Sequence, residues 1–241
     1  MDDHDQYYLT RPATSDRPLA GLTILLVEDS RFACEAFRLM CQHSGARLRR
    51  ADSLSHARQH LRTYRPAVVI IDLGLPDGAG ESLIAELARA QPRVDVILAT
   101  SGDPDGALRG AVAGADGFIA KPIARLSQFQ AELLRHLPRD RQPKGPRLIN
   151  DARIRPDQLA YRDDLSRCLE VLDASAQAPD LDYVVQFLTS VALAAGDHAL
   201  IAAVNDLSTR QRSGTGTGDA VTLLRGLLRQ RLEAQAQIGL Q

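Results

Sequence analysis

Five polar residues end apolar runs of the sequence, and their types suit the binding of a phosphoryl group. They are Glu28, Asp29, Asp72, Thr100 and Lys121. Carboxylates brought together repel one another unless a cation lies between them, and Mg²⁺ prefers such hard oxygen ligands. A hydroxyl group and an ammonium group beside them could hold the oxygens of a phosphoryl group on one of the acids. The set indicates a metal-assisted phosphoryl site, provided that the fold brings its members together.

The residues before Asp72 predict a buried strand that ends at this carboxylate. Residues 67–71 are apolar and mostly β-branched, which is typical of a strand buried on both faces of a parallel sheet. Gly74 and Pro76 then end the strand in a loop. A single aspartate at such a place more often caps a helix or faces water, so Asp72 alone is weak evidence. The evidence for a site at Asp72 comes from the polar residues that end the other strands.

Four further strands and five helices are expected around this strand. The strands are predicted at 22–27, 47–51, 94–99 and 117–120, and the helices at 31–44, between Ser53 and Pro66, and at 81–90, 104–113 and 123–137. This alternation predicts a parallel sheet covered by helices on both faces. The carboxyl ends of its strands lie along one edge, so the five polar residues should meet there. Agreement among these five residues, at the ends of four strands, favours a site over coincidence.

The chain from about Leu22 to Leu137 resembles the receiver domain of two-component response regulators. The matching segments are Leu-Val-Glu-Asp-Ser at 26–30, Ile-Asp-Leu-Gly-Leu-Pro-Asp-Gly at 71–78, Ala-Thr-Ser at 99–101 and Gly-Ala-Asp-Gly-Phe-Ile-Ala-Lys-Pro at 114–122. The resemblance implies a flavodoxin-like (βα)5 fold with a five-stranded parallel sheet. It also implies that the protein accepts a phosphoryl group from a sensor histidine kinase or a phosphotransfer protein.

The resemblance assigns a role to each residue of the set. Asp72 would be the phosphoacceptor, a nucleophilic carboxylate. Glu28, Asp29 and Asp72 would hold Mg²⁺ together with the backbone carbonyl of Gly74.

Two further positions would bind the phosphoryl oxygens, namely Thr100 and Lys121. Phe118 falls at the aromatic position that turns inward on phosphorylation, so Thr100 and Phe118 would form the switch. Beyond its own phosphorylation and dephosphorylation, the protein is not expected to be an enzyme.

The segments that flank the receiver region (21–137) have the composition of a leader and a linker. Residues 1–20 are polar, contain two prolines and lack periodicity, so a flexible leader is expected. Residues 138–150 contain three prolines, a glycine and four basic residues. A stiff, solvated spacer is favoured there over a basic arm that contacts phosphates.

From residue 151 to 241 the strand signals disappear, and four amphipathic helices are predicted. Their apolar positions are Leu159, Leu165, Leu169 and Leu172; Leu181, Val184, Val185, Leu188, Val191 and Ala192; Leu200, Ile201, Val204 and Leu207; and Val221, Leu224, Leu228 and Leu232. Breaks at Pro179, Gly196 and 213–218 are short, which argues for an antiparallel four-helix bundle. Residues 150–241 contain nine basic and twelve acidic residues, a net charge of −3 by subtraction. A nucleic-acid partner is therefore not expected.

The predicted bundle is weakly similar to histidine phosphotransfer domains, with one decisive departure. Their active helix carries His, any residue, Leu, Lys, Gly and a small residue, and Gln186 stands where the histidine is needed. A glutamine amide cannot accept a phosphoryl group as imidazole does. His198 offers another register, but it begins the third helix and lacks the lysine and glycine, so a solvated histidine is favoured. The bundle is expected to bind rather than to catalyse.

Two functions remain open at this stage. In the first, phosphorylation of Asp72 switches the contacts of the helical domain with a protein partner or with a second copy. In the alternative, the protein is a phosphorelay component or phosphate sink, with transfer through His198. The sequence has no signal peptide and no apolar run of 18 residues, so a cytoplasmic protein without a membrane span is expected.

Overall fold

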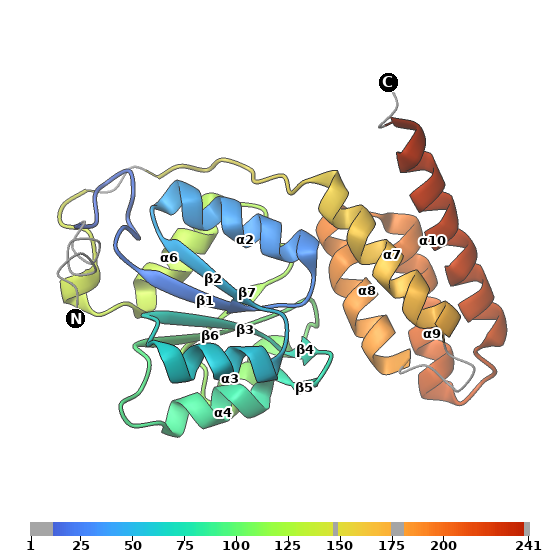
Figure 1. Ribbon diagram of the computed structural model, residues 1–241, viewed down its shortest axis with the longest axis horizontal. Coiled ribbons are helices and arrows are strands. Elements are labelled where there is room, and N and C mark those ends of the chain that lie inside the picture. Colours follow the sequence, from blue (N-terminus) through green and yellow to red (C-terminus); the bar gives the residue numbers. More distant parts are fainter. Residues whose placement is uncertain (1–11, 147–148, 175–180, 239–241) are drawn as a thin grey trace. The chain divides into compact units, whose positions relative to one another are not determined.

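The chain folds into two compact units. The computed structural model describes residues 12–146, 149–174 and 181–238 (Figure 1). The first unit runs to Asp29 and from Cys34 to Arg155, and the second contains Ser30–Ala33 and the chain from Pro156 onward. Within the described ranges, no helix has the length and apolarity needed to span a membrane.

Five parallel strands form the centre of the first unit. They are β1 (Thr23–Val27), β2 (Arg47–Ala51), β3 (Val68–Asp72), β6 (Val96–Ser101) and β7 (Gly117–Ala120). Their order across the sheet is β2-β1-β3-β6-β7, as Figure 1 shows. This is the flavodoxin-like order of a doubly wound α/β sheet, and it confirms the predicted fold class.

Helices cover both faces of this sheet. One face carries α2 (Arg31–Ser44) and α6 (Leu126–His136), and the other carries α3 (Leu54–Thr63), α4 (Gly80–Arg89) and α5 (Gly106–Ala113). Neighbouring residues of one strand enter opposite apolar layers: Ile70 packs under α2 and α6, and Ile71 packs under α3 and α4. The apolar runs are uninterrupted because both sides of each central strand are buried.

Several element boundaries in this unit are shifted from the sequence prediction, and one hairpin was not predicted; α6, for example, begins three residues later than expected. β6 begins two residues later than expected and includes Thr100. The loop after Asp72 contains a small antiparallel hairpin of β4 (Gly74–Leu75) and β5 (Gly78–Ala79), which was not predicted. Strands of two residues are too short to show a period in the sequence. The side chain of Asp77 accepts hydrogen bonds from the backbone N–H groups of Leu54 and Ser55, at 2.8 and 3.0 Å, and so fixes this loop to the start of α3.

The described end of the predicted leader is part of the folded unit. Leu19 is fully buried in the layer beneath α2 and α6, and its backbone N–H donates to the carbonyl of Ser44 at 2.9 Å. The expectation of a flexible leader is therefore wrong at Leu19, because one apolar side chain suffices to anchor a polar segment. Residues 1–11 lie outside the described part of the chain.

The predicted linker (138–150) is followed by a short stretch that lies along α6, inside the segment predicted to belong to the helical domain. The linker itself begins with a short 3₁₀ helix, η1 (Arg139–Arg141). Farther on, Ala152 accepts a hydrogen bond from the backbone of Leu126 at 3.1 Å, and Ile154 donates one to Ala124 at 3.0 Å. Ile154 also packs against the apolar layer. These contacts extend the first unit to Arg155.

Four helices account for most of the second unit: α7 (Gln158–Ala174), α8 (Leu181–Ala195), α9 (His198–Ser213) and α10 (Gly218–Ile238). Every one of them contributes buried side chains to one shared apolar core, including Leu165, Leu188, Val204 and Leu224. Leu159, predicted to face inward, is 59% exposed because it lies in the first turn of α7, ahead of the first buried residue, Tyr161. The break predicted at Gly196 is found between α8 and α9, whereas Pro179 lies outside the described residues.

Asp197 ties three of these helices together. Its carboxylate accepts hydrogen bonds from Arg231 of α10 at 2.7 and 3.1 Å, from the hydroxyl of Tyr161 of α7 at 3.0 Å, and from the backbone N–H of Leu200 of α9 at 3.1 Å. The bonds from Arg231, with those from Leu200 and Tyr161, hold the pKa of Asp197 at about 2 against the opposing effect of burial.

We expect Asp197→Asn to lower the free energy of unfolding of the second unit by about 1–2 kcal/mol at pH 7, with screening of this partly exposed pair included. Because the folded-state pKa is depressed, this stabilisation is present above about pH 4 and is lost as the pH falls through about 2. Hydrogen exchange of α9 at neutral pH and circular dichroism during acid titration measure the two effects. Asp206→Asn removes a more exposed aspartate of α9 and serves as the control. Equal exchange rates in the two variants would contradict the prediction.

Candidate functional site

Three buried carboxylates lie together at the carboxyl edge of the sheet. Glu28 and Asp29 follow β1 directly, and Asp72 is the last residue of β3. Each offers an oxygen atom within 4.8 Å of the oxygens offered by the other two. Strands β1 and β3 are neighbours in the sheet, which explains why acids 43 positions apart in the sequence (72 minus 29) lie side by side.

Lys121, which follows β7, reaches into this cluster. Its Nζ lies 2.6 Å from Oε2 of Glu28 and 2.9 Å from Oδ2 of Asp72. Burial raises the pKa of Glu28 to about 8, and Asp72 and Asp29 add to the rise while Lys121 opposes it. Burial disfavours the charged form of Lys121, but the carboxylates of Asp72 and Glu28 outweigh burial and raise its pKa, so the ammonium keeps its proton. One ammonium ion thus faces three acids.

The donor set of the cluster fits a magnesium ion. Three carboxylates in a small buried space provide hard oxygen ligands, and the charge that a single ammonium leaves uncompensated favours a divalent cation. Among the residues that the structure describes, these are the only three His, Cys, Asp or Glu side chains grouped closely enough to hold an ion. Gly74 lies two residues after Asp72 at the start of β4, and its carbonyl as a further ligand stays a prediction.

Thr100 lies beside Asp72 in the sheet, but its hydroxyl is engaged elsewhere. The register of β3 and β6 sets the two residues opposite each other. Thr100 is fully buried, and its hydroxyl donates to the backbone carbonyl of Ile119 in β7 at 2.8 Å. To donate to a group on Asp72, Thr100 has to give up this bond.

Gly80 allows the backbone to close tightly around the cluster, and sequence reasoning overlooked it. A Cβ atom at this position would lie 2.0 Å from the carbonyl oxygen of Asp72, a distance that no side chain could tolerate. The backbone N–H of Gly80 also donates to the carbonyl of Leu73 at 3.0 Å. The glycine therefore positions the loop that follows the acceptor candidate. Nothing in the sequence around Gly80, four residues before the buried Ile84, indicates this contact.

Phe118 of β7 packs beneath the first turn of α5. A Cβ atom at Gly106 would lie 3.0 Å from Cζ of the Phe118 ring and 2.9 Å from Cβ of Ser101. At Gly110 it would lie 2.6 Å from Cβ of Ala99. The two glycines make α5 a weak helix by propensity, and the structure shows that they let it lie close against β6 and the aromatic ring.

The two histidine-transfer candidates of the second unit lie on different helices. Gln186 is a partly buried residue of α8, and His198 is the exposed first residue of α9. The position of His198 matches the prediction of a solvated histidine at a helix start.

Comparison with known proteins places the first unit in a family. The family model of the response regulator receiver domain matches residues 24–133. The KDP operon transcriptional regulatory protein KdpE of Escherichia coli K12 is 29% identical over 110 residues, which cover 46% of this chain and 48% of that protein. The transcriptional regulatory protein DpiA of the same strain is 32% identical over 114 residues, 45% of this chain and 50% of that protein.

A crystal structure of a putative response regulator from Chloroflexus aurantiacus aligns with 30% identity and a TM-score of 0.40, over 42% of this chain and 85% of that one. The chain spans about half the length of the curated relatives it matches.

Proposed function

Because residues 24–133 form a response regulator receiver domain, we propose that the protein is a two-component response regulator switched by phosphorylation of Asp72. The observation that carries the proposal is the buried cluster in which Lys121 contacts both Asp72 and Glu28. A nucleophile, a metal-binding pair of acids and a fixed cation are the groups that acyl phosphate formation requires.

In the proposed reaction, a carboxylate oxygen of Asp72 attacks the phosphorus atom of a phosphohistidine. The donor is a sensor histidine kinase or a phosphotransfer protein. The phosphorus–nitrogen bond breaks, and its electron pair returns to the imidazole ring. Lys121, 2.9 Å from Asp72, is placed to donate to a phosphoryl oxygen. Mg²⁺ held by Glu28, Asp29 and Asp72, with Gly74, would neutralise charge on the transferring group.

Magnesium dependence tests this proposal. Acetyl phosphate should add one phosphoryl group to the protein in the presence of Mg²⁺ and none in EDTA, as measured by intact-mass spectrometry. Asp29→Asn should weaken Mg²⁺ binding by about tenfold or more in calorimetric titration, because it removes a charged ligand. Asp105→Asn is the control, since this exposed aspartate lies outside the cluster and makes no capping hydrogen bond. Equal Mg²⁺ affinities in both variants would remove the basis of the site assignment.

For the second unit we propose a binding role controlled by the receiver, with a protein partner or a second copy of the chain. Its net charge of −3 over residues 150–241 disfavours a nucleic-acid partner. The curated relatives are named as transcriptional regulators, but this chain matches only about half of their length.

Relay through His198 is less favoured, because no lysine or glycine follows it in the required pattern and Gln186 replaces the histidine of α8. His198→Gln should leave labelling by a phosphorylated donor unchanged.

The proposed switch runs through Thr100 and Phe118. When Thr100 turns toward a phosphoryl group it releases Ile119, the residue next to Phe118, and the ring can then move away from the first turn of α5. A phosphoryl mimic such as beryllofluoride should therefore change hydrogen exchange over 104–137, and the proposed output requires a change in 150–241 as well.

We expect Phe118→Ala to blunt the exchange change at α5 without preventing phosphorylation. Leu108→Ala is the matched control, because Leu108 belongs to α5 itself but has 69% of its surface exposed. If the mimic alters exchange at α5 equally in both variants, Phe118 does not carry the signal.

A further inference from the structure

The second unit includes four residues that directly follow the acidic pair of the candidate site. They are Ser30–Ala33, which come after Asp29 without an intervening residue and contain the start of α2. Phe32 is 3% exposed and belongs to the apolar core that α7, α8, α9 and α10 share. Its ring lies 5.6 Å from that of Tyr161 of α7, measured between centroids. The core of the second unit therefore holds this segment in place.

Asp164 of α7, a buried residue of the same unit, caps the amino end of α2. Its Oδ2 accepts hydrogen bonds from the hydroxyl of Ser30 at 2.7 Å and from the backbone N–H of Phe32 at 3.0 Å, and its Oδ1 accepts one from the N–H of Arg31 at 2.9 Å. The hydroxyl oxygen of Ser30 in turn accepts from the N–H of Ala33 at 3.0 Å. The first N–H groups of a helix have no partner inside it, and their positive dipole favours a carboxylate. Asp164 thus fixes the first turn of α2.

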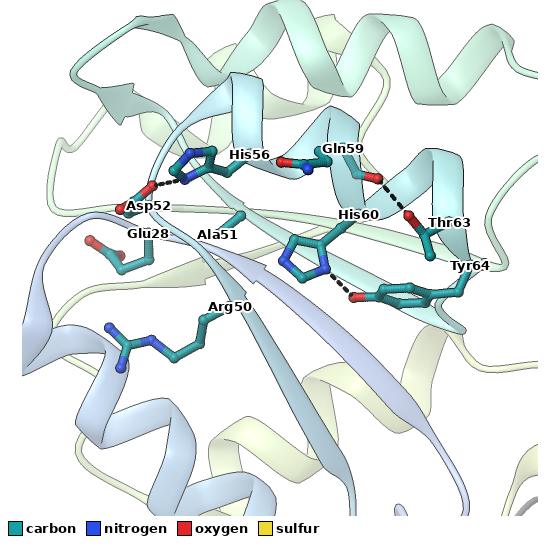
Figure 2. A pocket seen from close by; sticks show the side chains of 9 residues that line it. All are labelled: Glu28, Arg50, Ala51, Asp52, His56, Gln59, His60, Thr63 and Tyr64. Atoms are coloured by element: carbon teal, nitrogen blue, oxygen red, sulfur yellow. Dashed lines mark hydrogen bonds and ion pairs between the residues drawn. The ribbon is translucent and has the colours of Figure 1, made fainter.

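Asp29 lies between this capped turn and a residue that is anchored in the first unit. Figure 2 shows that residue, Glu28, beside Ala51, the last residue of β2. The backbone N–H of Glu28 donates to the carbonyl of Ala51 at 2.9 Å, and the carbonyl of Glu28 accepts from the thiol of Cys34 at 3.4 Å. With Ser30 held on the other side, the backbone of Asp29 is fixed at both ends. A ligand that is held in its binding geometry loses less conformational freedom when the ion binds.

We propose that Asp164 is a positioning residue for the metal-binding acids, because the turn that it caps orients Asp29. The inference rests on the proposed Mg²⁺ site and goes beyond it, since it makes the metal affinity of the receiver domain depend on a residue of the helical unit. Coupling between two binding equilibria is reciprocal, so Mg²⁺ should in turn strengthen the contacts of Asp164 with residues 30–33. The helix α7 then responds to the metal content of the site.

Calorimetric titration of the full chain with Mg²⁺ tests the inference. Asp164→Ala should weaken Mg²⁺ binding by about tenfold, as is usual when a residue that orients metal ligands is removed. Asp163→Ala is the matched control, because Asp163 is the adjacent residue of α7 and pairs with the exposed guanidinium group of Arg31 at 2.6 Å. This control should bind Mg²⁺ as the wild type does, since exposed ion pairs contribute little. Circular dichroism measures whether both variants are folded.

Ser30→Ala is a milder variant of the same cap. It removes the hydroxyl bond to Asp164 and leaves the two backbone bonds, so Mg²⁺ binding should weaken by about threefold. If Asp164→Ala does not fold, equal Mg²⁺ affinity of Ser30→Ala and the wild type overturns the inference. Reciprocity gives a second readout: Mg²⁺ should slow hydrogen exchange at Arg31 and Phe32 in the wild type but not in Asp164→Ala.

A measurement without metal separates this inference from the proposed function. In EDTA, the backbone amide NMR signal of Asp29 should shift in Asp164→Ala and stay at its wild-type position in Asp163→Ala. If the wild type binds no Mg²⁺, the metal site is wrong, and the Asp29 signal still decides whether Asp164 positions that residue. The inference is overturned if this signal is the same in the two variants, or if the wild type binds Mg²⁺ and both variants match its affinity.

Discussion

A chain carrying Asp72→Asn should accept no phosphoryl group from acetyl phosphate, while its sheet remains folded. The asparagine keeps the shape of the side chain and one oxygen acceptor, but a neutral amide is no nucleophile for acyl phosphate formation. It also removes one negative charge from a cluster in which burial and repulsion already raise the pKa of Glu28, so the fold should not be weakened. Intact-mass spectrometry measures the phosphoryl adduct, and circular dichroism measures the fold.

The same loop provides a matched control in Asp77→Asn. Asp77 lies five residues after Asp72, and its carboxylate is directed at the backbone of Leu54 and Ser55 rather than at the acidic cluster. Its variant should be labelled as the wild type is. An Asp72→Asn protein that is labelled to the wild-type extent would place the acceptor elsewhere and end the assignment.

The parts of the fold that could be predicted from sequence are those with a local cause. Apolar runs in the sequence predict β1 and β3, because both faces of a central strand are buried. The polar residues that end those strands are then brought together by topology alone, because parallel strands share one carboxyl edge. The strand order and the strand ends are therefore enough to predict that Glu28, Asp29 and Asp72 lie close together.

The parts that could not be predicted depend on pairings between distant segments. Leu19 is buried by contact with a helix that begins 12 residues later, and the partly buried Ile154 packs against the same layer and donates a backbone hydrogen bond to Ala124. Composition classed the segment around Leu19 as a flexible leader, and the domain boundary was placed at residue 150, whereas the first unit extends to Arg155. Likewise, helix propensity indicates only that Gly106 and Gly110 weaken their helix. It does not show that a Cβ atom at either position would collide with side chains of the sheet.

The site shows the same division. Residue types predicted which groups meet, but not where each hydrogen bond goes. That Thr100 binds a phosphoryl oxygen stays a prediction, whereas the hydrogen bond from its hydroxyl to the carbonyl of Ile119 had no signal in the sequence. That bond joins β6, the neighbour of the acceptor strand β3, to β7, the strand that carries Phe118.

Replacing Lys121 by methionine should produce the largest loss of stability among the variants considered. The lysine side chain is 3% exposed and contacts two carboxylates, and its removal leaves three acids within 4.8 Å of one another. Breaking a buried ion pair on one side typically lowers the free energy of unfolding by about 3 kcal/mol or more. We expect a loss of this size in EDTA at neutral pH, measured by urea unfolding, together with loss of labelling by acetyl phosphate.

Two dependences distinguish this charge effect from simple loss of packing. Mg²⁺ should restore much of the lost stability, because a divalent cation replaces the missing ammonium. Without Lys121 the pKa of Glu28 should rise above its value of about 8. A carboxyl group whose pKa is raised in the folded state loses stability as the pH increases from its unfolded pKa toward its folded pKa. Wild type and variant share this loss up to about pH 8, so the deficit of the variant should stay constant between pH 5 and pH 8 and grow as the pH rises above 8.

The chain offers a close control because it has only two lysines, Lys121 and the exposed Lys144. Lys144→Met should unfold as the wild type does at every pH and Mg²⁺ concentration. Lys121→Arg keeps the positive charge but changes the shape of the group that carries it. This variant should regain much of the stability but less of the labelling, because the donor to a phosphoryl oxygen has to lie at one position near Asp72. If Lys121→Met is equally destabilised with and without Mg²⁺, and equally at pH 7 and pH 9, the lysine acts by filling space, and the electrostatic account of the cluster is wrong.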